Sequence, residues 1–196
     1  MEHALRLRWD RATIAARVAE LGARITAAYA GRDLLMVTVL KGGAVFLADL
    51  VRAVDADVDV DFLAVRLLHS GTSGSVGISK DLEVDIAGRD VLLVEDVIRS
   101  GLTMSHLVRT LAARDPASVR VCTLLDGIDR RRVSVPVDHV GFEVGSELLV
   151  GYGLDLDGWF RNCPDLWEVV DERAVRASPL AALARIRSIE GASPRT

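Results

Sequence analysis

Residues 91–104, VLLVEDVIRSGLTM, constrain the fold of this chain more than any other stretch. Apolar residues interrupted by two adjacent acids are typical of a buried strand that ends in polar groups. Small and hydroxyl-bearing residues follow, where the chain turns into a helical pattern. Backbone N–H groups, hydroxyls and the helix dipole at such a turn can bind a phosphate. The segment therefore predicts a strand, a phosphate-binding loop and a helix, in that order.

The acids near the end of this strand, Glu95 and Asp96, indicate a second binding function. Two carboxylates at the end of a buried strand are costly unless a cation or a hydroxyl group pairs with them. Ribose hydroxyls and a hydrated Mg²⁺ both suit such a pair. We therefore expect a sugar phosphate and a metal ion to bind near residues 95–103.

Composition limits the class of protein. The chain has 196 residues, half of them hydrophobic, and a formal net charge of -4, which predicts one well-buried globular domain. No basic stripe marks a nucleic-acid-binding surface, and the run Arg130–Arg132 is interpreted as a solvated loop. We expect no membrane helix and no secretion, because the sequence shows neither a long apolar span nor a leader. Cys122 and Cys163 fit a reducing compartment, so the expected location is the cytoplasm.

Helical and strand patterns alternate along the chain. Apolar residues at three-to-four spacing predict helices at 10–30, 44–54, 102–114 and 173–189, the last with a break at Pro179. Short apolar runs predict strands at 34–40, 58–68, 91–96, 118–126, 139–144 and 147–153. The Gly- and Ser-rich stretch 69–79 predicts a mobile loop.

This order of elements predicts an α/β fold with a mostly parallel central sheet flanked by helices. Ligands of such sheets bind outside the carboxyl ends of the strands. Three polar segments follow predicted strands, namely Lys41–Gly43, residues 95–103 and Asp126–Gly127. We expect them to converge on one site.

The ordered motifs resemble those of the type I phosphoribosyltransferases, and of the hypoxanthine-guanine branch in particular. VLLVEDVIRSGLT is similar to that family's phosphoribosyl pyrophosphate motif, and VLKGGAVFLADLVR to its pyrophosphate loop and following helix. DFLAV, KDLEVDIAGRD, VGFEV, VGYGLD and WFRNCP match in order, so the resemblance covers residues 33 to about 170. It implies a single domain at 1–172, in which about 127–172 and the N-terminal segment form a small hood. A C-terminal helix and polar tail follow at 173–196.

The resemblance implies transfer of a 5-phosphoribosyl group from phosphoribosyl pyrophosphate to a purine nitrogen, with Mg²⁺ and release of pyrophosphate. It also implies a homodimer or homotetramer, a cis peptide before Lys41, and a flexible loop around 68–79 that closes over the site. It places the catalytic positions on Glu95, Asp96 and Arg99. It places phosphate and ribose contacts on Lys41, Gly42, Gly43, Arg99, Ser100, Gly101, Leu102, Thr103 and Arg161. It places metal contacts, mostly through water or ligand hydroxyls, on Glu95, Asp96 and Asp155, and the base-side pocket on Ile98, Gly127, Leu148, Leu149 and Asp155.

Four departures from the family's pattern all fall on the base side. The family has Asp where this chain has Arg99, Lys at Gly127, an aromatic ring at Leu148, and Ser-Tyr at Leu67-Leu68. A guanidinium stays charged and cannot accept a proton. Glycine offers no donor to the 6-oxo group of a purine, and leucine keeps only part of the stacking on a base.

Our main prediction is therefore a phosphoribosyltransferase-like enzyme that binds phosphoribosyl pyrophosphate or another ribose 5-phosphate compound but uses a non-standard acceptor. A carboxylated ring from specialised metabolism would suit Arg99, because guanidinium and carboxylate pair bidentately. The alternatives are an ordinary hypoxanthine/guanine salvage enzyme, a non-catalytic nucleotide- or phosphoribosyl pyrophosphate-binding regulatory protein, and altered chemistry on a ribosyl phosphate adduct. In an interpretation without a changed acceptor, Arg99 faces solvent or a neighbouring acid, and Leu148 is an ordinary core residue.

Overall fold

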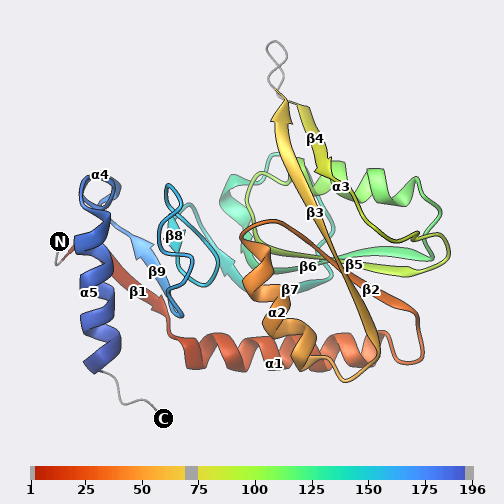
Figure 1. Cartoon of the computed structure of the whole chain (residues 1–196), viewed down its shortest axis with the longest axis horizontal. Helices are drawn as coiled ribbons and strands as arrows, with labels where there is room; N and C mark the ends of the chain where they lie inside the picture. Colours follow the sequence, from red (N-terminus) through yellow and green to blue (C-terminus); the bar gives the residue numbers. More distant parts are fainter. Residues whose placement is uncertain (1–2, 69–74, 193–196) are drawn as a thin grey trace. The chain divides into compact units, whose positions relative to one another are not determined.

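The computed structural model describes residues 3–68 and 75–192, which fall into two compact units (Figure 1). Residues 15–146 form the larger unit. The residues up to Ile14 and those from Glu147 onward form the smaller unit. Each unit has its own sheet and its own hydrophobic core. No helix in residues 3–68 and 75–192 has the length and apolar character of a membrane span.

The larger unit contains a six-stranded sheet in the order β4-β3-β2-β5-β6-β7. Five of these strands run parallel, and the edge strand β4 is antiparallel to β3. The strands are β2 (Leu34–Val39), β3 (Val58–Leu68), β4 (Ser75–Lys80), β5 (Asp90–Ile98), β6 (Ser118–Gly127) and β7 (His139–Val144). The predicted α/β fold with a mostly parallel sheet is confirmed.

Helices cover both faces of this sheet, which explains why every residue of β2 is buried. Neighbouring strand residues point to opposite faces. Leu35 and Leu93 pack with Leu107 of α3 in one core cluster, and α2 lies against the opposite face (Figure 1). The helices of this unit are α1 (Arg11–Ala28), which begins in the smaller unit, α2 (Gly43–Ala53), α3 (Leu102–Ala112) and the short 3₁₀ helix η1 (Ile128–Arg130).

The smaller unit is built from both ends of the chain. Its antiparallel sheet has the order β1-β9-β8, and Leu5 of the first strand lies opposite Val169. Its elements are β1 (Leu5–Trp9), β8 (Leu149–Val150), β9 (Leu166–Val169), α4 (Glu172–Ala177) and α5 (Pro179–Ala192). Trp167 and Ile186 are buried in one core cluster, so α5 is part of this unit's core.

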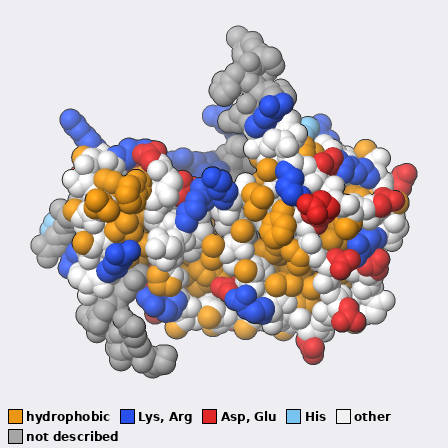
Figure 2. Space-filling view, viewed as in Figure 1, with side chains coloured by type: hydrophobic (Ala, Val, Ile, Leu, Met, Phe, Trp, Pro, Cys, Tyr) orange, Lys and Arg blue, Asp and Glu red, His pale blue; other side chains and the backbone are white. Residues whose placement is uncertain are grey.

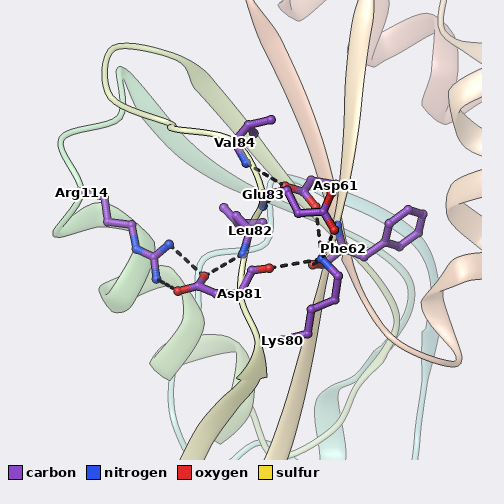
Figure 3. Close-up of polar contacts among 8 residues, drawn as sticks. All are labelled: Asp61, Phe62, Lys80, Asp81, Leu82, Glu83, Val84 and Arg114. Carbon is purple, nitrogen blue, oxygen red and sulfur yellow. Dashed lines mark hydrogen bonds and ion pairs between the residues drawn. The ribbon is translucent and has the colours of Figure 1, made fainter.

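A two-stranded arm leaves the larger sheet. The pairing of β3 with β2 ends at Leu63, and from Ala64 onward β3 pairs with β4. The base of this arm is held by Asp61, whose carboxylate accepts hydrogen bonds from the N–H groups of Phe62, Glu83 and Val84 at 2.7, 2.7 and 3.3 Å (Figure 3).

Two cations complete this arrangement, which we call the arm anchor: Asp61, Lys80, Asp81 and Arg114. The Nζ of Lys80 lies 3.6 Å from Asp61 Oδ1 and donates to the carbonyl of Phe62 at 3.1 Å. Arg114, just beyond α3, donates two hydrogen bonds to Asp81 at 2.9 and 2.8 Å (Figure 3). The start of β3 and the end of β4 are thus tied together, and the residue after β4 is tied to the end of α3.

Several sequence predictions need correction. Residues 75–79, predicted within a mobile loop, belong to β4 (Ser75–Lys80), because Val76 and Ile78 alternate with small residues at the period of a strand. The rest of that loop, 69–74, lies outside the described residues. Within 147–153 only Leu149–Val150 is a strand, since Gly151 and Gly153 have positive φ and turn the chain. The strands β1 and β9 were not predicted, whereas the helix break at Pro179 is confirmed.

The face drawn in Figure 2 carries hydrophobic side chains over α2 and β3, with acidic and basic side chains around them. Val45 of α2 and Val60 of β3 are exposed apolar residues. Faces of this kind are typical of association surfaces. The homodimer or homotetramer stays a prediction.

Candidate active site

The larger unit contains an open cavity at the carboxyl ends of β2 and β5, where a sheet of this type is expected to bind ligands. Its volume is about 350 Å³. Six of the predicted site residues line it: Glu95, Ile98, Arg99, Ser100, Gly101 and Thr103. Glu95 and the phosphate loop therefore open into the same cavity, whereas Asp96 does not line it.

The phosphate loop, residues 99–103, turns the chain from β5 into α3. Gly101 has a φ of +79°, a left-handed conformation that glycine adopts without steric penalty. The first N–H groups of α3 have no carbonyl one turn earlier in the helix, and the positive end of the helix dipole lies there. An anion in the cavity therefore meets backbone donors and the hydroxyl of Thr103. Leu102 is exposed and does not line the cavity.

The predicted pyrophosphate loop, Lys41–Gly43, joins β2 to α2 beside the acids. The peptide bond between Leu40 and Lys41 is cis, as the resemblance implies. A Cβ atom at Gly42 would overlap the Asp96 carboxylate, so a larger residue there would require this carboxylate to move. The loop and the acid pair are therefore in direct contact, and Leu40 lines the cavity.

Glu95 and Asp96 differ in environment. Asp96 is buried and accepts a hydrogen bond from the N–H of Val97 at 2.7 Å. Glu95 lines the cavity, and its Oε2 is shielded from solvent with no hydrogen-bond partner among the described residues. Burial raises the pKa of Glu95 well above its ordinary value, and the neighbouring charge of Asp96 raises it further. An unpaired buried carboxyl beside a second acid is a site for a cation or for hydroxyl donors.

The donor set fits Mg²⁺ in part. Carboxylate oxygens are the ligands that Mg²⁺ prefers, and it is usually held by one or two carboxylates together with water and substrate oxygens. Glu95 and Asp96 supply two such groups, one of them with an orphaned oxygen. In the part of the chain that the structure describes, no group of three or more His, Cys, Asp or Glu residues could hold a metal. A metal here would therefore need oxygens from its substrate.

Three base-side residues are brought together. Ile98 and Arg99 line the cavity, and Gly127 at the end of β6 lies beside them. A Cβ atom at Gly127 would lie 3.0 Å from the carbonyl oxygen of Ile98 and 3.7 Å from Cγ of Arg99. Gly127 therefore lies directly beside Ile98 and Arg99.

The remaining predicted residues, Leu148, Leu149, Asp155 and Arg161, belong to the smaller unit. Leu149 is buried in β8, and Leu148 packs against the core of that unit. Arg161 Nη2 lies 2.6 Å from Asp155 Oδ1, and the N–H of Gly158 donates to Asp155 Oδ2 at 2.7 Å. Asp155 and Arg161 therefore pair with each other, and their roles toward metal and pyrophosphate stay predictions.

Sequence reasoning missed part of the cavity wall. Val39, Leu40, Val65, Val97 and Met104 line it without having been predicted. Four of them lie within two residues of a predicted site residue, and this closeness in sequence could have indicated them. Val65 lies on the arm, and no motif in the sequence indicated that the arm reaches the cavity.

The basic run Arg130–Arg132 was predicted to be a solvated loop, but its three side chains differ in exposure. Arg130 and Arg132 are exposed, but the side chain of Arg131 is only 18% exposed and forms an ion pair with Asp126. The sequence pattern could not separate the three residues, because burial depends on the loop that carries them past Gly101.

Comparison with known proteins agrees with this geometry. The model of the phosphoribosyl transferase domain matches residues 10–155. The hypoxanthine-guanine phosphoribosyltransferase of Mycobacterium avium is 50% identical over 157 residues, which are 76% of this chain and 77% of the relative. The hypoxanthine phosphoribosyltransferase of Escherichia coli K12 is 43% identical over 174 residues, 87% of this chain and 98% of the relative. The chain belongs to the phosphoribosyltransferase family.

Solved structures support the same assignment. A hypoxanthine phosphoribosyltransferase from Staphylococcus aureus matches with a TM-score of 0.82 and 35% identity, over 86% of this chain and 94% of that one. A mutant hypoxanthine phosphoribosyltransferase from Trypanosoma cruzi, solved as a ternary substrates complex, matches with a TM-score of 0.83 and 32% identity, over 88% and 98%. This phosphoribosyltransferase is therefore a type I enzyme that groups with the hypoxanthine-guanine branch.

Proposed function

We propose that this phosphoribosyltransferase transfers the 5-phosphoribosyl group of phosphoribosyl pyrophosphate to a ring nitrogen of hypoxanthine or guanine. The observation that carries the proposal is one cavity lined by both the buried acid Glu95 and a phosphate loop at a helix N-terminus. The relatives named above support a purine as acceptor, because they are named as hypoxanthine or hypoxanthine-guanine enzymes. Ordinary purine salvage, the alternative interpretation of the sequence, thus fits better than our main prediction.

Different residues would bind different groups of the substrate. Gly101 and Thr103 would hold the 5′-phosphate at the start of α3, and Lys41–Gly43 would receive the pyrophosphate. Glu95 and Asp96 would accept from the ribose hydroxyls and hold Mg²⁺ through oxygen atoms. When bound, Mg²⁺ would neutralise charge on the departing pyrophosphate.

The chemistry is a substitution at the anomeric carbon. The bond from this carbon to a pyrophosphate oxygen breaks, and a bond to the acceptor nitrogen forms. Positive charge develops on the ribose in this step, and the carboxylates of Glu95 and Asp96 would stabilise it. Arg99 cannot accept the proton that the acceptor nitrogen loses, so this proton would leave to water or to pyrophosphate.

A direct assay tests the proposal. The protein is incubated with phosphoribosyl pyrophosphate, Mg²⁺ and either hypoxanthine or guanine, and the nucleotide and pyrophosphate are quantified by mass spectrometry and a coupled assay. We expect stoichiometric nucleotide and pyrophosphate from at least one purine, and loss of both in the Asp96→Asn variant. Absence of nucleotide with either purine at saturating substrate would contradict the proposal.

A second candidate is transfer to a non-standard, carboxylated acceptor. Arg99 favours it, because this cation lines the cavity beside Gly127. The comparisons lend no support to such an acceptor or to a role in specialised metabolism. Adding carboxylated bases and aromatic acids to the same assay separates the candidates: a kcat/KM above that for hypoxanthine and guanine would establish the second. Tight binding of phosphoribosyl pyrophosphate without any product would instead favour a regulatory protein.

The cytoplasmic location and the homo-oligomer stay predictions. Light scattering of the purified chain would give its mass in solution, and a monomer at assay concentration would contradict the expected dimer or tetramer.

A further inference from the structure

The segment Arg131–Val133 lies directly behind the phosphate loop. The N–H groups of Arg132 and Val133 both donate to the carbonyl oxygen of Ser100, at 2.9 and 3.1 Å. A Cβ atom at Gly101 would lie 2.5 Å from the carbonyl oxygen of Val133 and 3.2 Å from Cδ of Arg131. The segment and the loop are therefore packed as closely as a glycine allows.

This contact sets the direction of the loop's N–H groups. In a trans peptide the C=O and the following N–H point in opposite directions. The carbonyl of Ser100 points to Arg132 and Val133, so the N–H of Gly101 in the same peptide points away from them. Both Ser100 and Gly101 line the cavity. The hydrogen bonds to the Ser100 carbonyl thus orient the N–H of Gly101 toward the cavity, where an anion would bind.

The side chain of Arg131 holds this segment to the sheet. Its guanidinium pairs with Asp126, and the two side chains are only 18% and 15% exposed. Asp126 lies near the end of β6, opposite Ile98 of β5 in the parallel register. The ion pair therefore joins the segment behind the loop to β6, and β6 in turn pairs with β5, the strand that leads into the phosphate loop.

We infer that Arg131, held by Asp126, is a positioning residue that orients the phosphate loop for the 5′-phosphate of the substrate. The inference rests on the proposed function, because it takes the anion at Gly101 to be a sugar phosphate. It distinguishes Arg131 from its neighbours: Arg130 donates to the carbonyl of Ser146, and Arg132 is exposed and contributes its backbone N–H to the contact.

The first test compares two probes in three proteins. Binding of ribose 5-phosphate and of pyrophosphate with Mg²⁺ is measured by calorimetry for the wild type, Arg131→Met and the matched control Arg132→Met, which has the same charge change and keeps its backbone N–H. We expect Arg131→Met to weaken ribose 5-phosphate about 10-fold, roughly one misplaced hydrogen bond to a charged group. Pyrophosphate binding and both affinities of Arg132→Met should change less than about 2-fold, since rim charges contribute little. Equal loss of both probes in Arg131→Met, or no loss, would overturn the inference.

The Asp126→Asn variant separates orientation from simple attraction. If Arg131 acted only as a positive charge near the phosphate, removal of the negative Asp126 would strengthen ribose 5-phosphate binding. If the ion pair positions the segment, the same change weakens binding although a negative charge has been lost. Asparagine has nearly the size of aspartate, so this variant also serves where Arg131→Met does not fold. Stronger or unchanged binding in Asp126→Asn would overturn the inference.

These binding tests do not depend on which acceptor the enzyme uses. A wild type that binds ribose 5-phosphate but forms no nucleotide with either purine would refute the proposed function and leave the role of Arg131 standing. If the wild type turns over purine while Arg131→Met and Asp126→Asn keep full affinity for ribose 5-phosphate, the proposed function stands and the role of Arg131 is refuted. A wild type that does not bind ribose 5-phosphate would overturn the inference itself.

Discussion

Two glycines with left-handed backbones show how much a single residue position depends on the space around it. Gly101 and Gly88 have φ of +79° and +74°. A Cβ atom at Gly101 would lie 2.5 Å from the carbonyl of Val133, whereas a Cβ atom at Gly88 would meet nothing within 4 Å. The two glycines share a left-handed backbone conformation and differ in how closely other atoms approach them.

We expect Gly101→Ala to be more destabilising than Gly88→Ala. Both variants incur a strain of about 1 kcal/mol at a positive φ, and overpacking adds roughly 1–3 kcal/mol at Gly101 alone. Urea denaturation gives the free energy of unfolding of each, and calorimetry gives the affinity for ribose 5-phosphate. Affinity should fall only in Gly101→Ala. Equal destabilisation of the two variants would show that the Val133 contact relaxes without cost.

Glu95 should show a conflict between stability and activity. Burial disfavours its charged form, so the neutral isostere in Glu95→Gln is expected to raise the free energy of unfolding at pH 8 by roughly 1 kcal/mol. The same change removes a carboxylate from the reacting ribose and should lower kcat on the order of 100-fold. The exposed Glu20, paired with Arg17 on α1, is the control: Glu20→Gln should alter neither quantity measurably. A less stable Glu95→Gln protein would refute the expectation.

Individual residues were predictable where they belong to a local motif. Glu95, Asp96 and the loop 99–103 follow from the pattern of one strand and the helix after it. Val65 and Arg131 could not be found this way, because each reaches the site or its support through an element distant in sequence. The interpretation of Arg99 as evidence for a new acceptor shows the limit: the sequence identifies the residue type but not its partner.

Elements were predictable where the apolar period is long and unmixed. The strand β3 was expected with its observed bounds, and β5 was predicted but observed to be longer. The strand β4 was missed because its Gly and Ser residues are typical of loops, and only its pairing with β3 makes it a strand. An edge strand of this kind depends on tertiary contacts, and here the arm anchor supplies them.

Asp61→Asn should therefore destabilise the protein in a pH-dependent way. Burial raises the pKa of Asp61, but the N–H groups of Phe62, Glu83 and Val84 and the charge of Lys80 outweigh it, so the pKa lies below its ordinary value. An acid with a lowered pKa stabilises the fold above the unfolded pKa of about 3.9, and this contribution disappears as the pH falls through the folded pKa. We expect a loss of about 1–3 kcal/mol at pH 7, which shrinks below pH 4.

Chemical denaturation of the wild type and Asp61→Asn from pH 3 to pH 8 measures this difference. Glu83→Gln is the control, because the Glu83 side chain also pairs with Lys80 at 3.1 Å but is 77% exposed. It should cost less than about 0.5 kcal/mol at any pH. A pH-independent difference for Asp61→Asn would show that its hydrogen bonds, and not its charge, hold the arm.

At the scale of the whole molecule, the resemblance implied a small hood made of about 127–172 and the N-terminal segment, but no local pattern in the sequence indicated the bounds of the two units. A C-terminal helix and tail were predicted to follow a domain at 1–172. In the structure the residues up to Ile14 and those from Glu147 form one unit, with β1 paired to β9. Such pairing joins segments more than 150 residues apart, and no local period reveals it. The α/β class itself was predictable, because alternating strands and helices permit few other arrangements.

The structure therefore predicts that α5 supports the smaller unit as a core element. Ile186 is fully buried among Leu5, Trp167 and other apolar residues, whereas Leu180 on the same helix is 67% exposed. Ile186→Ala should lower the free energy of unfolding by about 2–5 kcal/mol, and Leu180→Ala by less than about 0.5 kcal/mol. Urea denaturation followed by tryptophan fluorescence measures both, since Trp167 lies in the same cluster. If Ile186→Ala were as mild as Leu180→Ala, α5 would be an appendage.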